Sequence, residues 1–154
     1  MVFRIAFLFF VILIGVRFDT YSQVRPTERF KQWEKTLVFS LVMGDHFKND
    51  SADIFIGGNK FFTNVKLISN PYDGCADVIV DVHKGEKGLY RVGIFERDSM
   101  TIQPLSEPVN VKLVFNGKVS EYIIDTKNGK YALFEKDASG QLYFRQSHRR
   151  PSFE

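Results

Sequence analysis

The chain has 154 residues, of which 25% are charged and 15% are aromatic, and its formal net charge at pH 7 is +3. The charges are interspersed along the sequence, which excludes a continuous basic stripe of the kind that binds nucleic acid. Cys75 is the only cysteine, so an intramolecular disulfide is excluded and the fold must depend on packing.

Residues 1–22 have the layout of a cleavable signal peptide. Arg4 precedes an unbroken apolar run, Ile5–Val16, and Thr20 and Ser22 supply the small residues that signal peptidase accepts. The run is shorter than the roughly 20 residues that a helix needs to span a bilayer, so we expect cleavage after Ser22. The sequence therefore predicts a secreted, periplasmic or cell-surface protein that meets the membrane only through its signal peptide. The mature part, residues 23–154, has the size of one domain.

The mature chain predicts a short helix followed by strands. Phe30, Trp33 and Leu37 stand at helical spacing and indicate a short helix or irregular arm within Gln23–Lys35. Short runs of β-branched and aromatic residues follow, each ended by Gly, Asn, Asp or Pro, and no space is left for crossover helices. The expected fold is therefore all-β, an antiparallel immunoglobulin-like β-sandwich. The predicted strands are Thr36–Met43, Ala52–Ile56, Phe61–Ser69, Ala76–His83, Leu89–Glu96, Val109–Phe115, Val119–Ile124, Tyr131–Glu135 and Gln141–Arg145.

Local patterns add detail to this sandwich. Asn116-Gly117 and Asn128-Gly129 are dipeptides that favour tight hairpin turns, because both residues tolerate positive φ. Phe61 and Phe62 are adjacent in a predicted strand, so one of the two is expected to reach the outer face.

Two stretches resemble a known family. Asp73–Val82, followed by Lys84-Gly85 and Gly88–Val92, is similar to the first half of the SprB-type repeat of surface adhesins in gliding bacteria, and Asn128–Gly140 is similar to its second half. The usual Gly-Gly and Pro-Tyr elements are replaced here by Gly85–Gly88. Ser106–Val111 also looks like the last strands of a fibronectin type III domain. Both resemblances imply an immunoglobulin-like sandwich, and the SprB-type resemblance implies a module of exported Bacteroidetes proteins. Shared sandwich architecture is the favoured explanation of the pattern.

The polar clusters of the sequence do not form a recognisable catalytic or metal motif. Asp81 and His83 share one strand face, and Asp45-His46 could complete a metal site with them, but a solvated strand face is the favoured interpretation. No Gly-x-Ser-x-Gly is present. Calcium is a further alternative for the oxygen-rich stretch within 45–53, which lacks the glycine and distal glutamate of a calcium loop. We therefore predict no enzyme activity, no metal and no cofactor.

The expected function is that of an exported binding module, an adhesion or cell-envelope accessory protein that contacts an envelope or surface protein. The loops Gly44–Ser51 and Arg97–Pro108 are candidate contact regions, and the latter carries Met100 and Ile102. An exposed edge strand that accepts a strand from a partner is another route.

A carbohydrate-binding module is the alternative, with Trp33, Phe62 and Tyr72 as surface aromatics. Aromatics in a row on one outer face would favour sugar, whereas a polar face with an apolar strand edge would favour protein. The basic C-terminal cluster of Arg145, His148, Arg149 and Arg150 predicts a solvated tail, with contact to anionic polysaccharide or lipid headgroups as its alternative.

Overall fold

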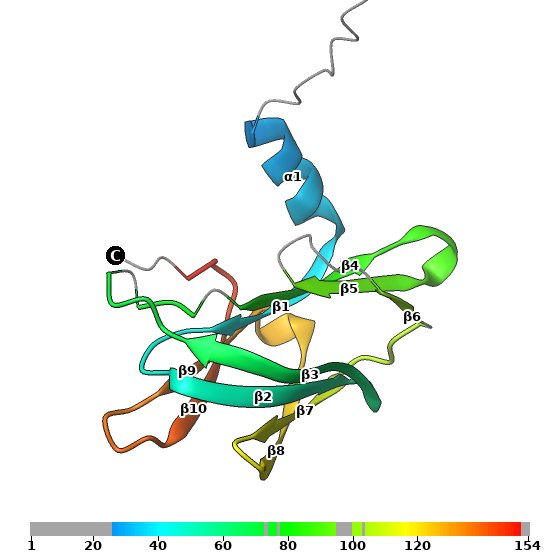
Figure 1. Cartoon of the computed structure of the whole chain (residues 1–154). Coiled ribbons are helices and arrows are strands. Elements are labelled where there is room, and N and C mark those ends of the chain that lie inside the picture. The colour runs from blue at the N-terminus through cyan, green and yellow to red at the C-terminus, as the bar shows by residue number, and fades with distance from the viewer. Residues whose placement is uncertain (1–25, 73, 77, 95–99, 103, 152–154) are drawn as a thin grey trace, which may run out of the picture.

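One α-helix and ten strands make up the described part of the chain, which comprises residues 26–72, 74–76, 78–94, 100–102 and 104–151 of a computed structural model (Figure 1). The predicted signal peptide, residues 1–22, lies outside these residues. The elements in chain order are α1 (Pro26–Thr36), β1 (Leu37–Met43), β2 (Lys48–Ile56), β3 (Asn59–Ile68), β4 (Ile79–Lys84), β5 (Tyr90–Ile94), β6 (Met100–Ile102), β7 (Val109–Phe115), β8 (Lys118–Ile124), β9 (Tyr131–Lys136) and β10 (Leu142–Ser147), with short 3-10 turns at Glu86–Gly88 and Thr126–Asn128.

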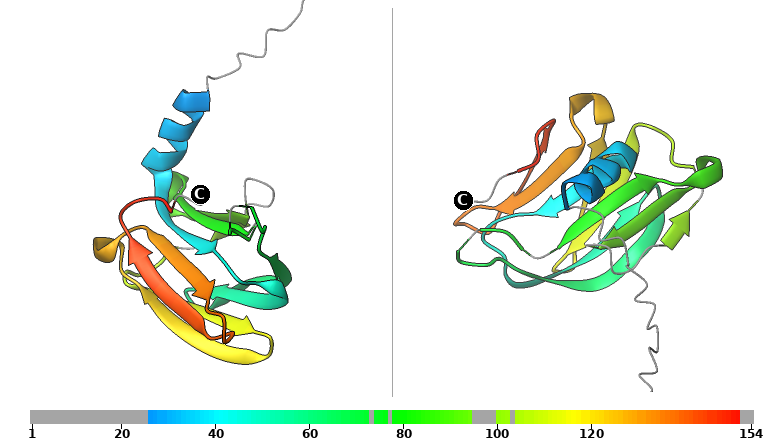
Figure 2. Two further views of the ribbon diagram at one scale, coloured as in Figure 1. Left: turned by 90° about the vertical axis from the view of Figure 1, so that its left-hand side faces the viewer. Right: turned by 90° about the horizontal axis from the view of Figure 1, so that it is seen from above.

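The strands form two packed sheets, which confirms the predicted all-β sandwich. A six-stranded sheet A has the order β10-β9-β1-β4-β5-β6, and a four-stranded sheet B has the order β3-β2-β7-β8. Every pairing between these strands is antiparallel except that of β1 with β9, which is parallel. Helix α1 projects from the sandwich on the side of sheet A (Figure 2).

Alternation along the strands builds the core between the sheets. Val80 and Val82 of β4 are fully buried, and they join Leu113 and Ile54 of sheet B within one hydrophobic cluster. Burying such a side chain contributes about 1.5–3 kcal/mol to folding. At one side, an aromatic cluster joins the sheets through ring centroids 5.0–5.2 Å apart, made of Tyr122, Phe134 and Phe144.

Of the two predicted Asn-Gly hairpins, one is confirmed and one is wrong. Asn116 and Gly117 have φ of 47° and 80° and join β7 to β8, with Phe115 opposite Lys118. Asn128 instead ends a 3-10 turn and Gly129 follows it, in the connection from β8 of sheet B to β9 of sheet A. A Cβ at residue 129 would lie 2.3 Å from the backbone carbon of Ser147, so the glycine is required there by close packing.

The predicted loop Gly44–Ser51 is shorter than expected, because β2 begins at Lys48. Asp50, one of the oxygen-rich residues considered for calcium, is buried and accepts hydrogen bonds from Asn116 Nδ2 at 2.7 Å and Lys136 Nζ at 3.0 Å. Burial by itself raises the pKa of Asp50, but the hydrogen bonds from Asn116, the Lys48 amide and Lys136 outweigh it and lower the pKa. Since Lys136 is on β9, this ion pair joins sheet A to sheet B.

The expectation that Phe61 or Phe62 reaches the outer face is wrong. Both side chains are partly buried and pack against the core cluster. The pairing of β2 with β3 shifts register on both sides of Ile54, which pairs with Phe62. Such bulges interrupt the strict alternation of side chains, so neighbouring residues can lie on the same side.

The region Arg97–Pro108 contains a short strand that the sequence did not predict. Met100–Ile102 forms β6, which pairs with β5 at one edge of sheet A. The side chains of Met100 and Ile102 lie outside the described part of the structure.

We predict that Lys136→Met destabilises the protein by about 2 kcal/mol, because it leaves the carboxylate of Asp50 buried without its cation. Chemical denaturation at neutral pH measures this loss. Lys60→Met is the matched control: Lys60 pairs with Asp53 at 2.7 Å, but the two side chains are 40% and 25% exposed, so the loss should be much smaller. Equal losses in the two variants would contradict the structural role of the Asp50–Lys136 pair.

Candidate functional site

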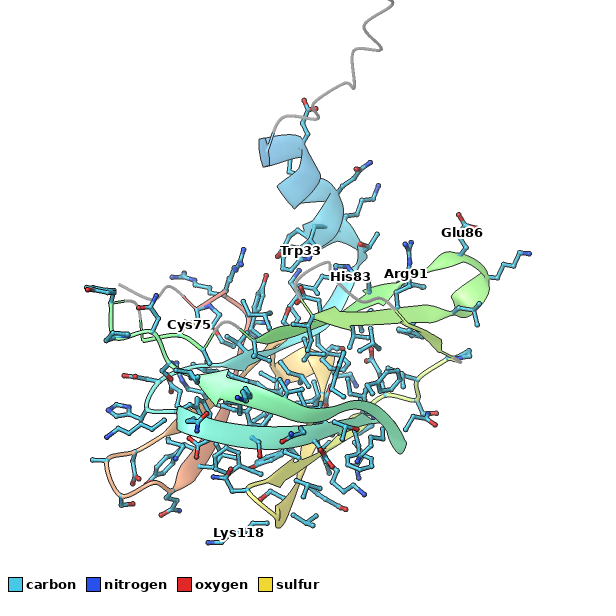
Figure 3. All side chains as sticks on the ribbon, viewed as in Figure 1. Trp33, Cys75, His83, Glu86, Arg91 and Lys118 are labelled. Carbon is cyan, nitrogen blue, oxygen red and sulfur yellow. The ribbon has the colours of Figure 1, made fainter. Side chains whose placement is uncertain are left out.

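A polar cluster lies between helix α1 and the outer face of sheet A. It includes Trp33 and Thr36 at the end of α1, Ser40 on β1, and Asp81 and His83 on β4. The rings of Trp33 and His83 are 5.6 Å apart in an edge-to-face arrangement, and Thr36 Oγ1 lies 3.0 Å from His83 Nδ1. Figure 3 shows Trp33 and His83 side by side at the base of the helix.

Asp81 supplies a buried carboxylate to this cluster. Burial raises its pKa above the ordinary value of 3.8, although a hydrogen bond from the Ser40 hydroxyl, the charge of His83 and a hydrogen bond from the Trp33 indole oppose this. Asp81 and His83 thus lie on the polar face of β4 that the alternation predicted, where Trp33 and Thr36 at the end of helix α1 contact them.

The contacts of this cluster attach the end of helix α1 to sheet A, since Trp33 and Thr36 contact Asp81 and His83. Ser40 is 1% exposed, and its hydroxyl donates to the Asp81 carboxylate, which fixes the orientation of both side chains. A second contact joins the same helix to β9, because Glu34 accepts from Tyr131 Oη at 3.0 Å and pairs with Lys130 Nζ at 2.8 Å. Burial and the adjacent Glu34 carboxylate raise the pKa of Tyr131.

The other residues considered for a metal, Asp45 and His46, form a separate pair in the connection from β1 to β2, with Asp45 Oδ2 and His46 Nδ1 3.2 Å apart. Among the described residues, no group of three or more His, Cys, Asp or Glu side chains is arranged to hold a metal ion. Within the same residues, no helix is both long enough and apolar enough to cross a membrane.

The C-terminal basic cluster contributes to the helix contact. Arg150 lies over the ring of Trp33, with its guanidinium carbon 5.4 Å from the ring centroid, and Arg145 Nε is 3.4 Å from a Glu135 carboxylate oxygen. Part of the predicted solvated tail is therefore packed on the domain.

The second candidate is a binding surface along strand β8, an outer strand of sheet B whose only partner strand in the described structure is β7 (Figure 1). In a hairpin with a two-residue turn, the two residues of the pair next to the turn are hydrogen-bonded to each other through the backbone. Hydrogen-bonded pairs then recur at every second position along the two strands. Phe115 and Lys118 are that first pair. The backbone N–H and C=O groups of Val119, Glu121 and Ile123 consequently point away from β7.

The side chains of the same three residues lie on the outer face of sheet B, because Tyr122 and Ile124 pack toward the core. Val119 is 62% exposed and Ile123 is 63% exposed. Strand β8 thus combines outward-pointing backbone groups with exposed apolar side chains, the two features that make a strand edge a template for pairing. We define the β8 edge as Val119, Glu121 and Ile123.

The structure distributes the predicted surface aromatics over separate elements. Trp33 is on α1 and is half-covered by His83 and Arg150, whereas Phe62 is on β3 and packs against the core. Tyr72 lies in the turn after β3 and is 91% exposed. On the outer face of sheet B, Phe55 carries Lys112 Nζ 3.9 Å and Lys60 Nζ 5.4 Å from its ring centroid.

Sequence reasoning missed Val119 and Ile123 as surface residues. The run Val119–Ile124 has apolar residues on both faces, so alternation did not indicate which face is buried. The Asn116-Gly117 turn fixed the pairing with β7, but the position of β8 at the edge depends on sheet order, which no local pattern encodes.

We predict that Asp81→Asn gains stability relative to the unchanged protein as the pH rises. Because the folded pKa of Asp81 is raised, the unfolded chain loses its proton first, near 3.8, and the folded state is destabilised as the pH rises from there through the raised value. Urea unfolding at pH 4 and pH 7 measures the difference in unfolding free energy, and Glu121→Gln controls for removal of one charge. The raised pKa would be contradicted if the unfolding free energy of the unchanged protein increased relative to that of Asp81→Asn as the pH rises.

The fold and these two candidate sites are the basis for any functional statement. No family model, no curated protein and no solved structure matches this chain. The resemblance to SprB-type repeats accordingly stays an expectation from the sequence, and function must be argued from the surface itself.

Proposed function

We propose that this protein is a non-catalytic binding module that recruits a partner protein through the β8 edge. The observation that carries the proposal is the coincidence of outward-pointing backbone groups with the exposed side chains of Val119 and Ile123 on one edge strand. An extended segment added there would gain main-chain hydrogen bonds and bury apolar surface at once.

The alternative surfaces on the same sheet are less suited to a ligand. The ring of Phe55 lies beneath Lys112, so it does not present an open aromatic face for a sugar. By the criterion set from the sequence, a polar face bordered by an apolar strand edge favours a protein partner.

The signal-peptide layout of residues 1–22 supports the remaining part of the proposal. It directs the domain to the periplasm, the cell surface or the medium, where the partner would be an envelope or surface protein. A role in adhesion or as an envelope accessory protein fits a small sandwich with this surface.

Carbohydrate binding is the second candidate, and the exposure of Tyr72 is the observation that favours it. An aromatic ring that is 91% exposed at a turn is available to stack on a sugar. In this second proposal the polysaccharide would contact the turn around Tyr72 rather than the β8 edge.

Site-specific photo-crosslinking tests the protein-binding proposal. With benzoylphenylalanine placed at Ile123 in cells that export the protein, we expect a covalent adduct with a second protein. The same probe at Lys66, an exposed position on β3 at the opposite edge of sheet B, should give none.

Val119→Lys, combined with the probe at Ile123, should abolish the adduct, because a lysine on an edge strand opposes strand addition. Its unfolding free energy should change by less than about 0.5 kcal/mol, as is usual for an exposed position. An adduct that is equally strong from Lys66, or that survives Val119→Lys, would contradict the proposal.

A glycan array separates the second candidate from the first. If polysaccharide is the ligand, binding should be lost in Tyr72→Ala and retained in Val119→Lys. Absence of glycan binding, together with an adduct specific to Ile123, would reject the carbohydrate-binding alternative.

A further inference from the structure

The β8 edge carries a charge between its two apolar side chains. Along the outer face the order is Val119, Glu121, Ile123, and the Glu121 side chain is exposed. Its carboxylate makes no hydrogen bond or ion pair with any described residue. An extended segment paired with this edge would therefore meet an apolar, an acidic and an apolar side chain in turn.

Strand β7 matches this pattern at two of its three positions on the other side of β8. Val114 lies opposite Val119 and Lys112 lies opposite Glu121, whereas the polar Asn110 lies opposite Ile123. The ammonium group of Lys112 is nevertheless directed to the ring of Phe55, 3.9 Å from its centroid, and makes no ion pair with Glu121. Within the described residues, the acidic position of β8 is thus left without a basic partner.

We propose that the β8 edge selects an antiparallel extended segment of another protein in which a lysine or arginine stands between two apolar residues at alternate positions. This inference rests on the proposed protein-binding function and names the partner's chemistry. In an antiparallel pair the opposing residues face each other directly, so the partner's basic residue lies across from Glu121 and its apolar residues lie across from Val119 and Ile123. The two intervening side chains point to the side of the sheet on which Tyr122 packs.

The same charge argues against a second copy of this chain as the occupant. If β8 paired with β8 of another copy so that Val119 faced Ile123, then Glu121 would face Glu121. Like charges directly opposite each other destabilise a strand pair. The register that pairs all three edge residues is therefore disfavoured for self-association.

Two capped seven-residue peptides test the inference with protein expressed from the full-length sequence. One alternates threonine with valine, lysine and valine; the other has glutamate in place of lysine. Titration followed by amide NMR should shift the signals of Val119, Glu121 and Ile123, with the lysine peptide binding about three- to tenfold more tightly. Glu121→Lys should reverse this preference, and Glu121→Gln should remove it.

Each other result would overturn the inference in a distinguishable way. Equal binding of both peptides at the β8 edge would reject charge selection while leaving the protein-binding function in place. Peptides that shift no β8 amide would reject strand addition itself, and the crosslink from Ile123 would then decide the proposed function separately. Concentration-dependent shifts of the same amides without peptide would identify a second copy as the occupant.

Discussion

The packing of one face of each strand between the two sheets is the constraint on which the rest of the structure depends. Once Val80 and Val82 of β4 enter the core, Asp81 and His83 must lie on the outer face, where Trp33 at the end of helix α1 contacts them. The same rule in β8 buries Ile124 and forces Val119 and Ile123 outward. No helix of the described chain covers that outer face, so the apolar side chains stay exposed.

The buried carboxylates of Asp50 and Asp81 show how the sandwich accommodates charge away from the β8 edge. Asp50 is stabilised as an anion, because Asn116 of the β7–β8 turn donates to it within sheet B and Lys136 donates to it from sheet A. Asp81 receives hydrogen bonds from Ser40 and Trp33, but burial dominates and raises its pKa. The first group ties the sheets together, and the second fixes the position of helix α1, so both have structural roles that account for their environment.

Local signals in the sequence predicted much of the fold. The strand Val109–Phe115 and the turn at Asn116-Gly117 agree with the structure, because alternation and turn chemistry are encoded by neighbouring residues. Long-range features were not predictable in the same way. The parallel pairing of β1 with β9 and the contact between Asp50 and Lys136 join residues far apart in the chain.

The β8 edge is likewise a long-range feature of the fold. The sequence supplied the idea of a receptive strand edge and a criterion for choosing between protein and sugar, but it identified surface aromatics and loops rather than β8. Trp33 and Phe62 have alternative packing partners in the structure. Only the order of strands in sheet B shows that Val119 and Ile123 border open space.

Residue-resolved amide hydrogen exchange of the unbound protein tests the central claim, that β8 is an unpaired edge, most directly. Slow exchange at Ser120 and Tyr122, whose N–H groups bond to β7, should alternate with fast exchange at Val119, Glu121 and Ile123. Uniform protection along the strand would mean that the outward groups are already bonded. The β8 edge would then be closed to a partner, which would contradict recruitment by strand addition.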